Sequence, residues 1–297
     1  MSATTAAQTP TLTTEFKERS LWKDALGRFR RNKLSVGALI LVILLILMAA
    51  TAGIFFPKGY DNQVYTETWE FPSAKHPMGT DPFGRDVLAR VMYGARISLS
   101  VALVVNLTAL IIGIPLGAAA GWFGGTVDYL LMRFVDIMST FPSLLFAILL
   151  MSVLGSGLVN VFIAMSITSW IGIARLIRGQ VLSLREQEYT LAARALGATD
   201  THIILRHMVP NALTPIIVTV TLGIPSAIMG EAGLSFLGVG VNPPMPSWGK
   251  MLNEYVPYMQ TFGYLALFPA IMIALTMYAF TLMGDGLRDA LDPAMKY

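Results

Sequence analysis

Histidine and acidic side chains are the first candidates for chemistry in this sequence. Four residues of types that hold metal ions or assist catalysis fall close together: His76, Asp81, Arg85 and Asp86. A site of the zinc type needs several strong ligands, and the other two histidines, His202 and His207, lie far along the chain. We therefore predict no metal site at this cluster.

The acidic residues of the cluster fit structural roles better. Asp81 before Pro82 is typical of a helix start, because aspartate caps free N–H groups and proline fits the first helical position. Asp86 and Arg90 are spaced i, i+4, which suits an ion pair on one helix face. We therefore expect a helix that begins at Pro82 and carries this pair.

The composition is that of an integral membrane protein. Of 297 residues, 55% are hydrophobic and 13% are charged, and the mean hydropathy is +0.62. In a soluble domain about a quarter of the residues carry a charge. A net charge of +3 is too small to indicate nucleic-acid binding, and the absence of cysteine excludes disulfides and thiolate metal sites.

Long apolar runs predict an all-α, polytopic membrane protein with six transmembrane helices, since roughly 20 apolar residues cross a bilayer. The predicted spans are 34–56, 97–120, 127–154, 158–177, 213–234 and 258–283. They divide the chain into an N-terminal segment 1–33, a first transmembrane helix 34–56, a loop 57–95 outside the cytoplasm, a core 96–283 of five helices and a tail 284–297.

Lysine and arginine predict the orientation in the membrane. Fourteen of them fall in the N-terminal segment, between spans four and five, and in the tail, against six in the other loops. Cytoplasmic segments are rich in these residues, so both termini and the segment 179–211 are predicted to be cytoplasmic. Trp22 and Phe29 suit a helix in the membrane interface, although a solvated basic flank fits as well. Trp248, in the loop 235–258, is expected at the opposite interface.

Small, bending and charged residues inside the spans predict local features. Gly113 and Gly117 favour close packing of the second span against a neighbour, and Pro142 predicts a kink in the third. Charges inside a span are costly unless they are neutralised. Arg133 and Asp136, three residues apart in the third span, are therefore expected to pair with each other.

The residues needed for enzyme chemistry are missing from the spans. An intramembrane hydrolase needs a nucleophile beside a base, yet all three histidines lie outside the predicted spans, and Asp128 and Asp136 share one span near its end. No phosphate-binding G-x-x-x-x-G-K-[ST] loop is present. We predict no catalytic residue and no cofactor bound by this chain. A channel or secondary transporter remains possible, but mid-span charges are nearly absent and we find no repeat.

The segment 179–211 is a polar interruption in an apolar chain. Its first part has an apolar stripe at i, i+3, i+4 and i+7, formed by Tyr189, Ala192, Ala193 and Leu196. Gly197 is expected to end this helix, with positive φ, Thr199 to cap a second one, and Pro210 to break it. A helix, a bend and a helix in the cytoplasm suit a docking element for another protein.

The same segment carries the resemblance to a known family. Leu191-Ala192-Ala193-x3-Gly197, nine residues, then His207-Met208-Val209-Pro210 resembles the EAA loop (EAA-x3-G-x9-I-x-L-P) of ABC-importer permeases. The strings 76–99, 188–211 and 230–249 resemble the peptide and nickel branch, and the likeness covers nearly the whole chain beyond Ser20. Leu191 replaces the family glutamate, and His207 and Val209 replace isoleucine and leucine, so no ion pair is carried over to position 191.

The resemblance implies a type I ABC importer permease in a bacterial cytoplasmic membrane. Its expected partners are a homologous second permease, two ATP-binding subunits that hold ATP and Mg²⁺, an extracytoplasmic substrate-binding protein and lipid. The implied ATPase-coupling residues are Glu188, Tyr189, Ala192, Ala193, Arg194, Gly197, Ala198, His202 and Arg206. ATP binding would move the coupling helix and switch the cavity between inward-facing and outward-facing packings.

The passage for cargo is expected at the interface with the second permease, lined by spans three and five. Candidate pathway or gate residues are Pro142, Pro225, Met229 and Glu231. A second interpretation of Glu231 is a carboxylate satisfied by neighbouring groups. Peptides are the expected cargo, and nickel complexes, glutathione or sugars are alternatives that no residue excludes. The loops 57–95 and 235–258 are expected to meet the binding protein.

Overall fold

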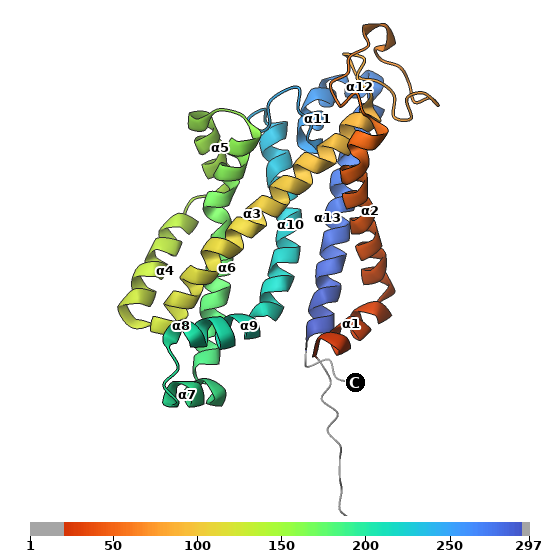
Figure 1. Ribbon diagram of the computed structural model, residues 1–297. Helices are drawn as coiled ribbons and strands as arrows, with labels where there is room; N and C mark the ends of the chain where they lie inside the picture. Colours follow the sequence, from red (N-terminus) through yellow and green to blue (C-terminus); the bar gives the residue numbers. More distant parts are fainter. Residues whose placement is uncertain (1–20, 293–297) are drawn as a thin grey trace, which may run out of the picture.

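The computed structural model describes residues 21–292 as an elongated bundle of helices (Figure 1). The basic residues Lys17, Arg19 and Lys296, used above for orientation, lie outside the described residues. Five described helices are long and apolar enough to cross a membrane. They are α2 (Lys33–Phe55), α3 (Val87–Phe123), α6 (Leu158–Arg185), α10 (Leu213–Phe236) and α13 (Tyr264–Leu291).

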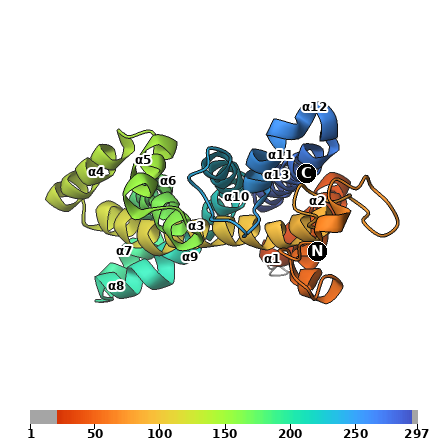
Figure 2. The same ribbon diagram turned by 90° about the horizontal axis from the view of Figure 1, so that it is seen from above.

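A sixth span is present if two shorter helices are taken as one. α4 (Gly125–Ser139) and α5 (Ser143–Leu154) meet at an angle of 78°. Pro142 directly precedes α5 and occupies its N-cap position. A bend at this proline is what the sequence predicts, but the helix is broken there rather than kinked. The third span is therefore two helices, which Figure 2 shows on the side of the bundle away from α2 and α13.

The second span begins ten residues earlier than the sequence analysis placed it. α3 starts at Val87, and the Asp86 carboxylate caps it by accepting the N–H of Ala89 at 2.9 Å. The prediction that Asp81 caps a helix beginning at Pro82 is wrong. Asp81 instead accepts the N–H groups of Phe83 and Arg85 in a turn before the helix.

Glycine lets α3 lie directly against α6. A Cβ added at Gly113 would stand 2.7 Å from the Ile173 side chain, and one at Gly117 would stand 2.3 Å from the carbonyl oxygen of Ala174. Real side chains do not approach this closely, so only glycine permits the observed separation. The close packing predicted from Gly113 and Gly117 is confirmed, and Gly121 extends it by one more turn.

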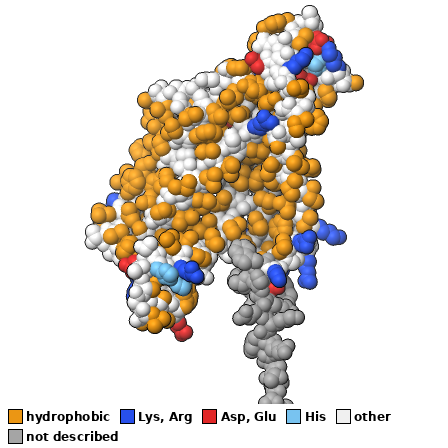
Figure 3. Space-filling view, in the orientation of Figure 1, with side chains coloured by type: hydrophobic (Ala, Val, Ile, Leu, Met, Phe, Trp, Pro, Cys, Tyr) orange, Lys and Arg blue, Asp and Glu red, His pale blue; other side chains and the backbone are white. Residues whose placement is uncertain are grey.

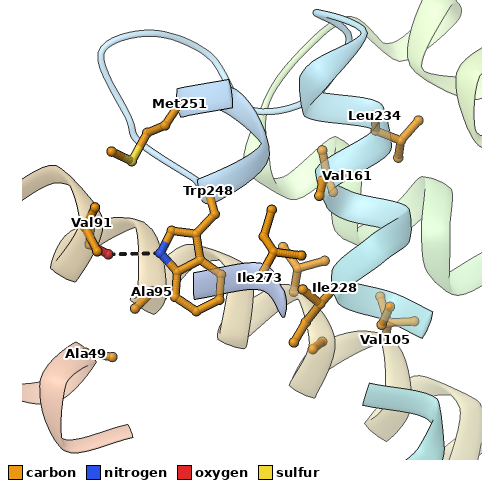
Figure 4. Packing of buried hydrophobic residues seen from close by; sticks show 14 of the residues in the cluster. Ala49, Val91, Ala95, Val105, Val161, Ile228, Leu234, Trp248, Met251 and Ile273 are labelled. Atoms are coloured by element: carbon orange, nitrogen blue, oxygen red, sulfur yellow. Dashed lines mark hydrogen bonds between the residues drawn. The ribbon is translucent and has the colours of Figure 1, made fainter. Parts of the chain in front are cut away.

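Trp248 lies in the main hydrophobic core and not at an interface, so that prediction is wrong. It opens α11 (Trp248–Tyr255), its side chain is 0% exposed, and its indole N–H donates to the carbonyl of Val91 at 3.1 Å. Figure 4 shows the ring among side chains from α3, α10 and α13. A buried indole needs a hydrogen-bond acceptor, and the early start of α3 provides it.

Two ends of the bundle differ in structure (Figure 1). One end carries the loop 57–86, which contains a 3₁₀ turn, η1 (Tyr65–Glu67). The helices α11, η3 (Val256–Tyr258) and α12 (Met259–Phe262) lie at the same end. The other end carries α1 (Leu21–Arg31) and the segment around α7 (Glu188–Ala195). α1 buries Phe29 beside α13 and Arg28 donates to the carbonyl of Asp292 at 2.9 Å, so this helix packs on the bundle rather than forming a merely solvated flank.

The charges of α4 pair with α6 rather than with each other. The Arg175 guanidinium lies 2.8 Å from the Asp136 carboxylate, and Arg178 donates two hydrogen bonds to Asp128. The predicted Arg133–Asp136 pair is wrong: the Arg133 guanidinium lies over the Tyr129 ring, 5.4 Å from its centre. Because both arginines come from α6, the pairs hold α4 alongside it near the α7 end of the bundle.

Candidate functional site

The segment 179–211 forms a helix, a bend and a helix, as predicted. α7 ends at Ala195, and Gly197 turns the chain with φ +81°. Thr199 caps α8 (Asp200–Ile203) by accepting the N–H of His202 at 3.4 Å. A side chain with a Cβ is strained at this φ, so glycine suits the turn.

Pro210 does not break the second helix, so that prediction is wrong. After α8 the chain continues through a π-helix, η2 (Ile204–Met208), into α9 (Val209–Asn211), and α10 follows at Leu213. Pro210 lies at the start of α9, directly after the π-helix, and the helical path continues through it. The segment 179–211, called the docking segment below, is thus joined to α10 by nearly continuous helix.

The inner face of this segment is fixed to the bundle. Ile203 and Met208 are fully buried in a cluster with Ile177 and Val181 of α6. The Thr190 hydroxyl donates to the carbonyl of Leu184 at 2.9 Å, which ties α7 to the end of α6. A displacement of the segment therefore moves α6 and α10 with it, since packed interiors are stiff.

Most of the predicted coupling residues are exposed on this segment, and one of them, Arg194, lays its guanidinium over the Trp122 ring of α3, 4.7 Å from its centre. Exposed are Glu188, Tyr189, Ala192, Arg194, Gly197, His202 and Arg206, while Ala193 and Ala198 are half-buried against the bundle. Figure 1 shows α7 projecting beyond the other helices, and Figure 3 shows histidine, basic and apolar side chains gathered at this end.

Large apolar residues, rather than alanine alone, dominate the outer face. Leu196 is 89% exposed, and Leu191 and Leu205 are also exposed. The sequence analysis placed Leu196 on one apolar stripe of α7 with Tyr189, Ala192 and Ala193, and all of these except the half-buried Ala193 are exposed. An exposed apolar group on a firmly anchored projection is typical of a surface that another protein covers.

A recess of about 300 Å³ lies between α3, α5, α6 and α10. Its polar lining consists of amide and hydroxyl side chains: Asn106, Ser143, Thr168, Ser169, Thr219 and Ser226. None of the residues that line it is acidic or basic. Such a surface offers hydrogen bonds to a polar ligand without selecting the sign of its charge.

The four predicted pathway or gate residues are not gathered at one place. Pro142 is exposed beside the recess residue Ser143, Pro225 is buried within an unbroken α10, and Met229 is 53% exposed. Glu231 does not reach the recess and is 0% exposed. In this conformation Glu231 is therefore enclosed by its neighbours, and its role in the pathway stays a prediction.

Glu231 joins three helices through serine hydroxyls. Its carboxylate accepts hydrogen bonds from Ser98 of α3 at 2.9 Å and from Ser235 at 2.7 Å. Ser98 in turn accepts the N–H of Trp248 at 3.4 Å, where α11 begins. The interpretation of Glu231 as a carboxylate satisfied by its neighbours is the one the structure supports.

Glu231→Ala is expected to lower the stability of the folded chain by about 1–3 kcal/mol, because it leaves buried hydroxyls without their acceptor. Thermal unfolding of the purified complex measures this. Glu231→Gln keeps an acceptor oxygen and serves as the matched variant, with a smaller loss. Equal stability of wild type and Glu231→Ala would show that these bonds contribute nothing.

The end opposite α7 is closed by buried ion pairs. Arg90 of α3 is fully buried, and its guanidinium lies 2.6 Å from the Glu254 carboxylate of α11. Arg85 bridges Glu254 and Asp81, with distances of 3.1 and 2.6 Å. The predicted Asp86–Arg90 pair is therefore wrong, because Arg90 turns toward α11. These long-range pairs fix the loop 57–86 to the bundle.

The remaining members of the sequence cluster lie on the surface of that loop. The His76 ring donates to Asp86 at 2.7 Å and to Glu67 at 3.1 Å. Burial disfavours the charged ring, but the hydrogen bonds to Asp86 and Glu67 outweigh it and raise the pKa of His76. Asp86 therefore both caps α3 and orients this histidine.

Two family models match the chain. The model described as "Binding-protein-dependent transport system inner membrane component" matches residues 113–297. The model described as "N-terminal TM domain of oligopeptide transport permease C" matches residues 20–72. Together they cover the first span, the segment 179–211 and the recess residues of α5, α6 and α10.

Relatives of known function match along most of the chain. The oligopeptide transport system permease protein OppC of Bacillus subtilis is 46% identical over 94% of this chain and 92% of its own length. The dipeptide transport system permease protein DppC of the same organism is 43% identical over 93% of this chain and 87% of its own. The glutathione transport system permease protein GsiD of Pectobacterium atrosepticum is 41% identical, over 94% and 93%.

Among solved structures, a chain of the inward-facing MetNI methionine ABC transporter matches with a TM-score of 0.55 and 18% identity, over 68% of this chain and 96% of that one. The expected type I ABC importer permease fold is thereby confirmed. With the family matches and the identities above, the chain belongs to the binding-protein-dependent transport permeases of bacterial inner membranes.

Proposed function

We propose that this chain is the transmembrane permease subunit of an ATP-driven importer that moves peptides inward. The observation that carries the proposal is its 43–46% identity to oligopeptide and dipeptide permeases over more than nine-tenths of the chain. The glutathione permeases at 41–43% identity make glutathione, itself a short peptide, the second candidate cargo.

The docking segment gives such a subunit its connection to ATP. In the proposal, α7 and the residues up to Arg206 bind an ATP-binding subunit in the cytoplasm. Both termini are then cytoplasmic as well, because α1 and the last turns of α13 lie at the same end of the bundle as α7. Leu196 and its exposed apolar neighbours supply the contact, and Ile203 and Met208 transmit displacement to α6 and α10. Because α10 lines the recess, the same movement reshapes the proposed cargo passage.

The recess suits peptides because peptides share a polar backbone and differ in charge. Hydroxyl and amide side chains hydrogen-bond any peptide backbone, and an uncharged lining repels neither acidic nor basic side chains. A homologous second permease would complete the passage on the open side of α5 and α10. The substrate-binding protein would dock at the opposite end, on the loop 57–86 and around α11 and α12.

Reconstitution tests the proposal. The chain is purified with its partner permease, ATP-binding subunits and binding protein, placed in liposomes, and supplied with labelled peptides, glutathione and a nickel chelate in turn. Uptake of peptides that requires ATP on the α7 side of the membrane is expected. ATP-independent flux would indicate a channel or secondary transporter. ATP-dependent uptake of the nickel chelate alone would mean that the cargo is a nickel complex and not a peptide.

Ser226→Asp is expected to reduce uptake of an acidic peptide about tenfold relative to a neutral one, because a carboxylate in the recess repels like charge. Ser226 is exposed in the recess, so the substitution needs no repacking. Competition between the two labelled peptides in liposomes measures the ratio. Ser226→Asn is the neutral control, and an unchanged ratio in Ser226→Asp would place the passage elsewhere.

A further inference from the structure

The loop 57–86 holds two separate stretches of chain face to face. The Thr80 N–H donates to the carbonyl of Glu70 at 3.0 Å, and the Thr80 hydroxyl accepts the N–H of Glu70 at 2.8 Å. Gly79, with φ +75°, lets the backbone pass so near Glu70 that a Cβ would stand 2.5 Å from its carbonyl oxygen. These contacts fix residues 67–70 beside residues 76–80.

Three potential metal ligands lie close together where residues 67–70 face residues 76–80. One donor atom each from Glu67, Glu70 and His76 lies within 4.8 Å of the other two. The His76 Nε2 atom is 3.1 Å from a Glu67 carboxylate oxygen and 4.0 Å from one of Glu70. Two ligands of a tetrahedral zinc ion, each about 2.0–2.2 Å from the metal, stand about 3.3–3.6 Å apart. Small side-chain rotations therefore bring the three atoms into that geometry.

Asp86, which is not one of the three, holds the histidine in the orientation a metal needs. The His76 Nδ1–H donates to Asp86 Oδ2 at 2.7 Å, so Nε2 faces the two glutamates. The other Asp86 oxygen is fixed by the first turn of α3. A carboxylate that orients a ligating histidine through its second ring nitrogen is a recurrent feature of metal sites in proteins.

The surroundings allow an ion to enter and to be neutralised. His76 is 13% exposed, Glu67 23% and Glu70 40% at their side chains, which leaves a solvent-facing position for a water ligand. Lys75 bonds Oε1 of Glu67 and leaves Oε2, the oxygen beside His76 Nε2, for the ion. We propose that Glu67, Glu70 and His76 bind one divalent metal ion of the zinc type at this end of the permease, with Asp86 as the positioning residue.

The donor set selects the class of ion. One imidazole nitrogen with two carboxylate oxygens and a water is typical of zinc, whereas calcium and magnesium take oxygen ligands. In the metal-free chain a proton on Nε2 fills the place of the ion, and the metal displaces it. The ion would fasten residues 67–70 to residue 76 on the surface that Figure 3 shows crowded with charged and histidine side chains.

Zinc titration of the assembled, chelator-treated complex tests the proposal. Equilibrium dialysis against ZnCl₂ should find one site per copy of this chain that His76→Gln removes, that Glu70→Gln weakens, and that Asp86→Asn weakens 10–100-fold. His202→Gln, at the opposite end, is the matched histidine control and should keep the site. Size-exclusion elution and thermal unfolding of each variant's complex show that it is folded.

Three results would overturn the proposal. The first is equal zinc binding by wild type, His76→Gln and Glu70→Gln. The second is loss of the site in His202→Gln. The third is calcium or magnesium competing with zinc at equal concentration, since an oxygen-only site would then hold the ion.

Discussion

Replacing Gly117 by valine is expected to prevent α3 from packing on α6 and to abolish the folded permease. A Cβ at Gly117 would stand 2.3 Å from the Ala174 carbonyl and 2.8 Å from the Ile177 side chain. Neither the α6 backbone nor its branched side chains can rotate away. Overpacking typically costs about 1–3 kcal/mol and occasionally more, and a clash with helix backbone belongs at the upper end because the two helices can respond only by moving apart.

The yield of monodisperse complex and its thermal unfolding measure this effect. Gly37→Val is the matched control, since Gly37 lies in α2 and nothing stands within 4 Å of an added Cβ. It tests the same change of residue at a position in a span where the added side chain meets nothing. Normal yield and stability of Gly117→Val would mean that α3 and α6 are farther apart than the structure shows.

Gly197→Val is expected to uncouple ATP hydrolysis from transport while leaving the spans folded. The residue has φ +81° at the end of α7, where a branched side chain costs about 1–2 kcal/mol in backbone strain. An added Cβ meets nothing within 4 Å, so strain and not a clash changes the turn. The altered turn changes the direction in which Leu196 and its neighbours project, so the contact with the ATP-binding subunit is lost. The ATPase activity measured with binding protein and peptide should therefore fall to the basal level.

Asparagine at the same position separates backbone strain from the mere presence of a side chain. Asn adopts positive φ more readily than valine does, so Gly197→Asn should retain most of the stimulation. Equal stimulation in Gly197→Val and wild type would refute the role of this turn. Equal loss in both variants would mean that side-chain bulk at the contact, rather than backbone conformation, matters.

Features set by nearby residues were predictable from the sequence. The apolar run of α2, the glycines of α3, the turn at Gly197 and the Thr199 cap depend on composition and on neighbours within one or two helical turns. The bend at Pro142 was predictable in position but not in size. Its angle of 78° depends on how α4 and α5 pack, which no local pattern states.

Features set by distant partners were not predictable in this way. Arg133 and Asp136 have the right spacing to pair, but Asp136 bonds Arg175 of another helix instead. Arg90 likewise leaves Asp86 for Glu254, far along the chain. Local spacing shows which residues can meet on one helix, whereas the packing of the helices against one another decides which partner is reached.

Trp248 and Glu231 show the same limit at the candidate site. A tryptophan in a glycine- and proline-rich loop resembles an interfacial anchor, yet α11 carries it into the core beside Val91. Glu231 has the type expected of a pathway residue, but Ser98 of α3 and Ser235 of its own helix bond its carboxylate. The recess instead uses small neutral residues, whose types alone carry no signal of function.

The proposed contact between α7 and an ATP-binding subunit is tested most directly by one cross-linking measurement. Since the chain has no cysteine, Leu196→Cys gives this subunit a single thiol for a photo-activated cross-linker at its most exposed apolar position. The account predicts cross-links to the ATP-binding subunits that change with nucleotide, and none from Phe71→Cys at the opposite end. Cross-links from position 196 to the substrate-binding protein, or labelling there by an impermeant reagent from outside the cell, would contradict it.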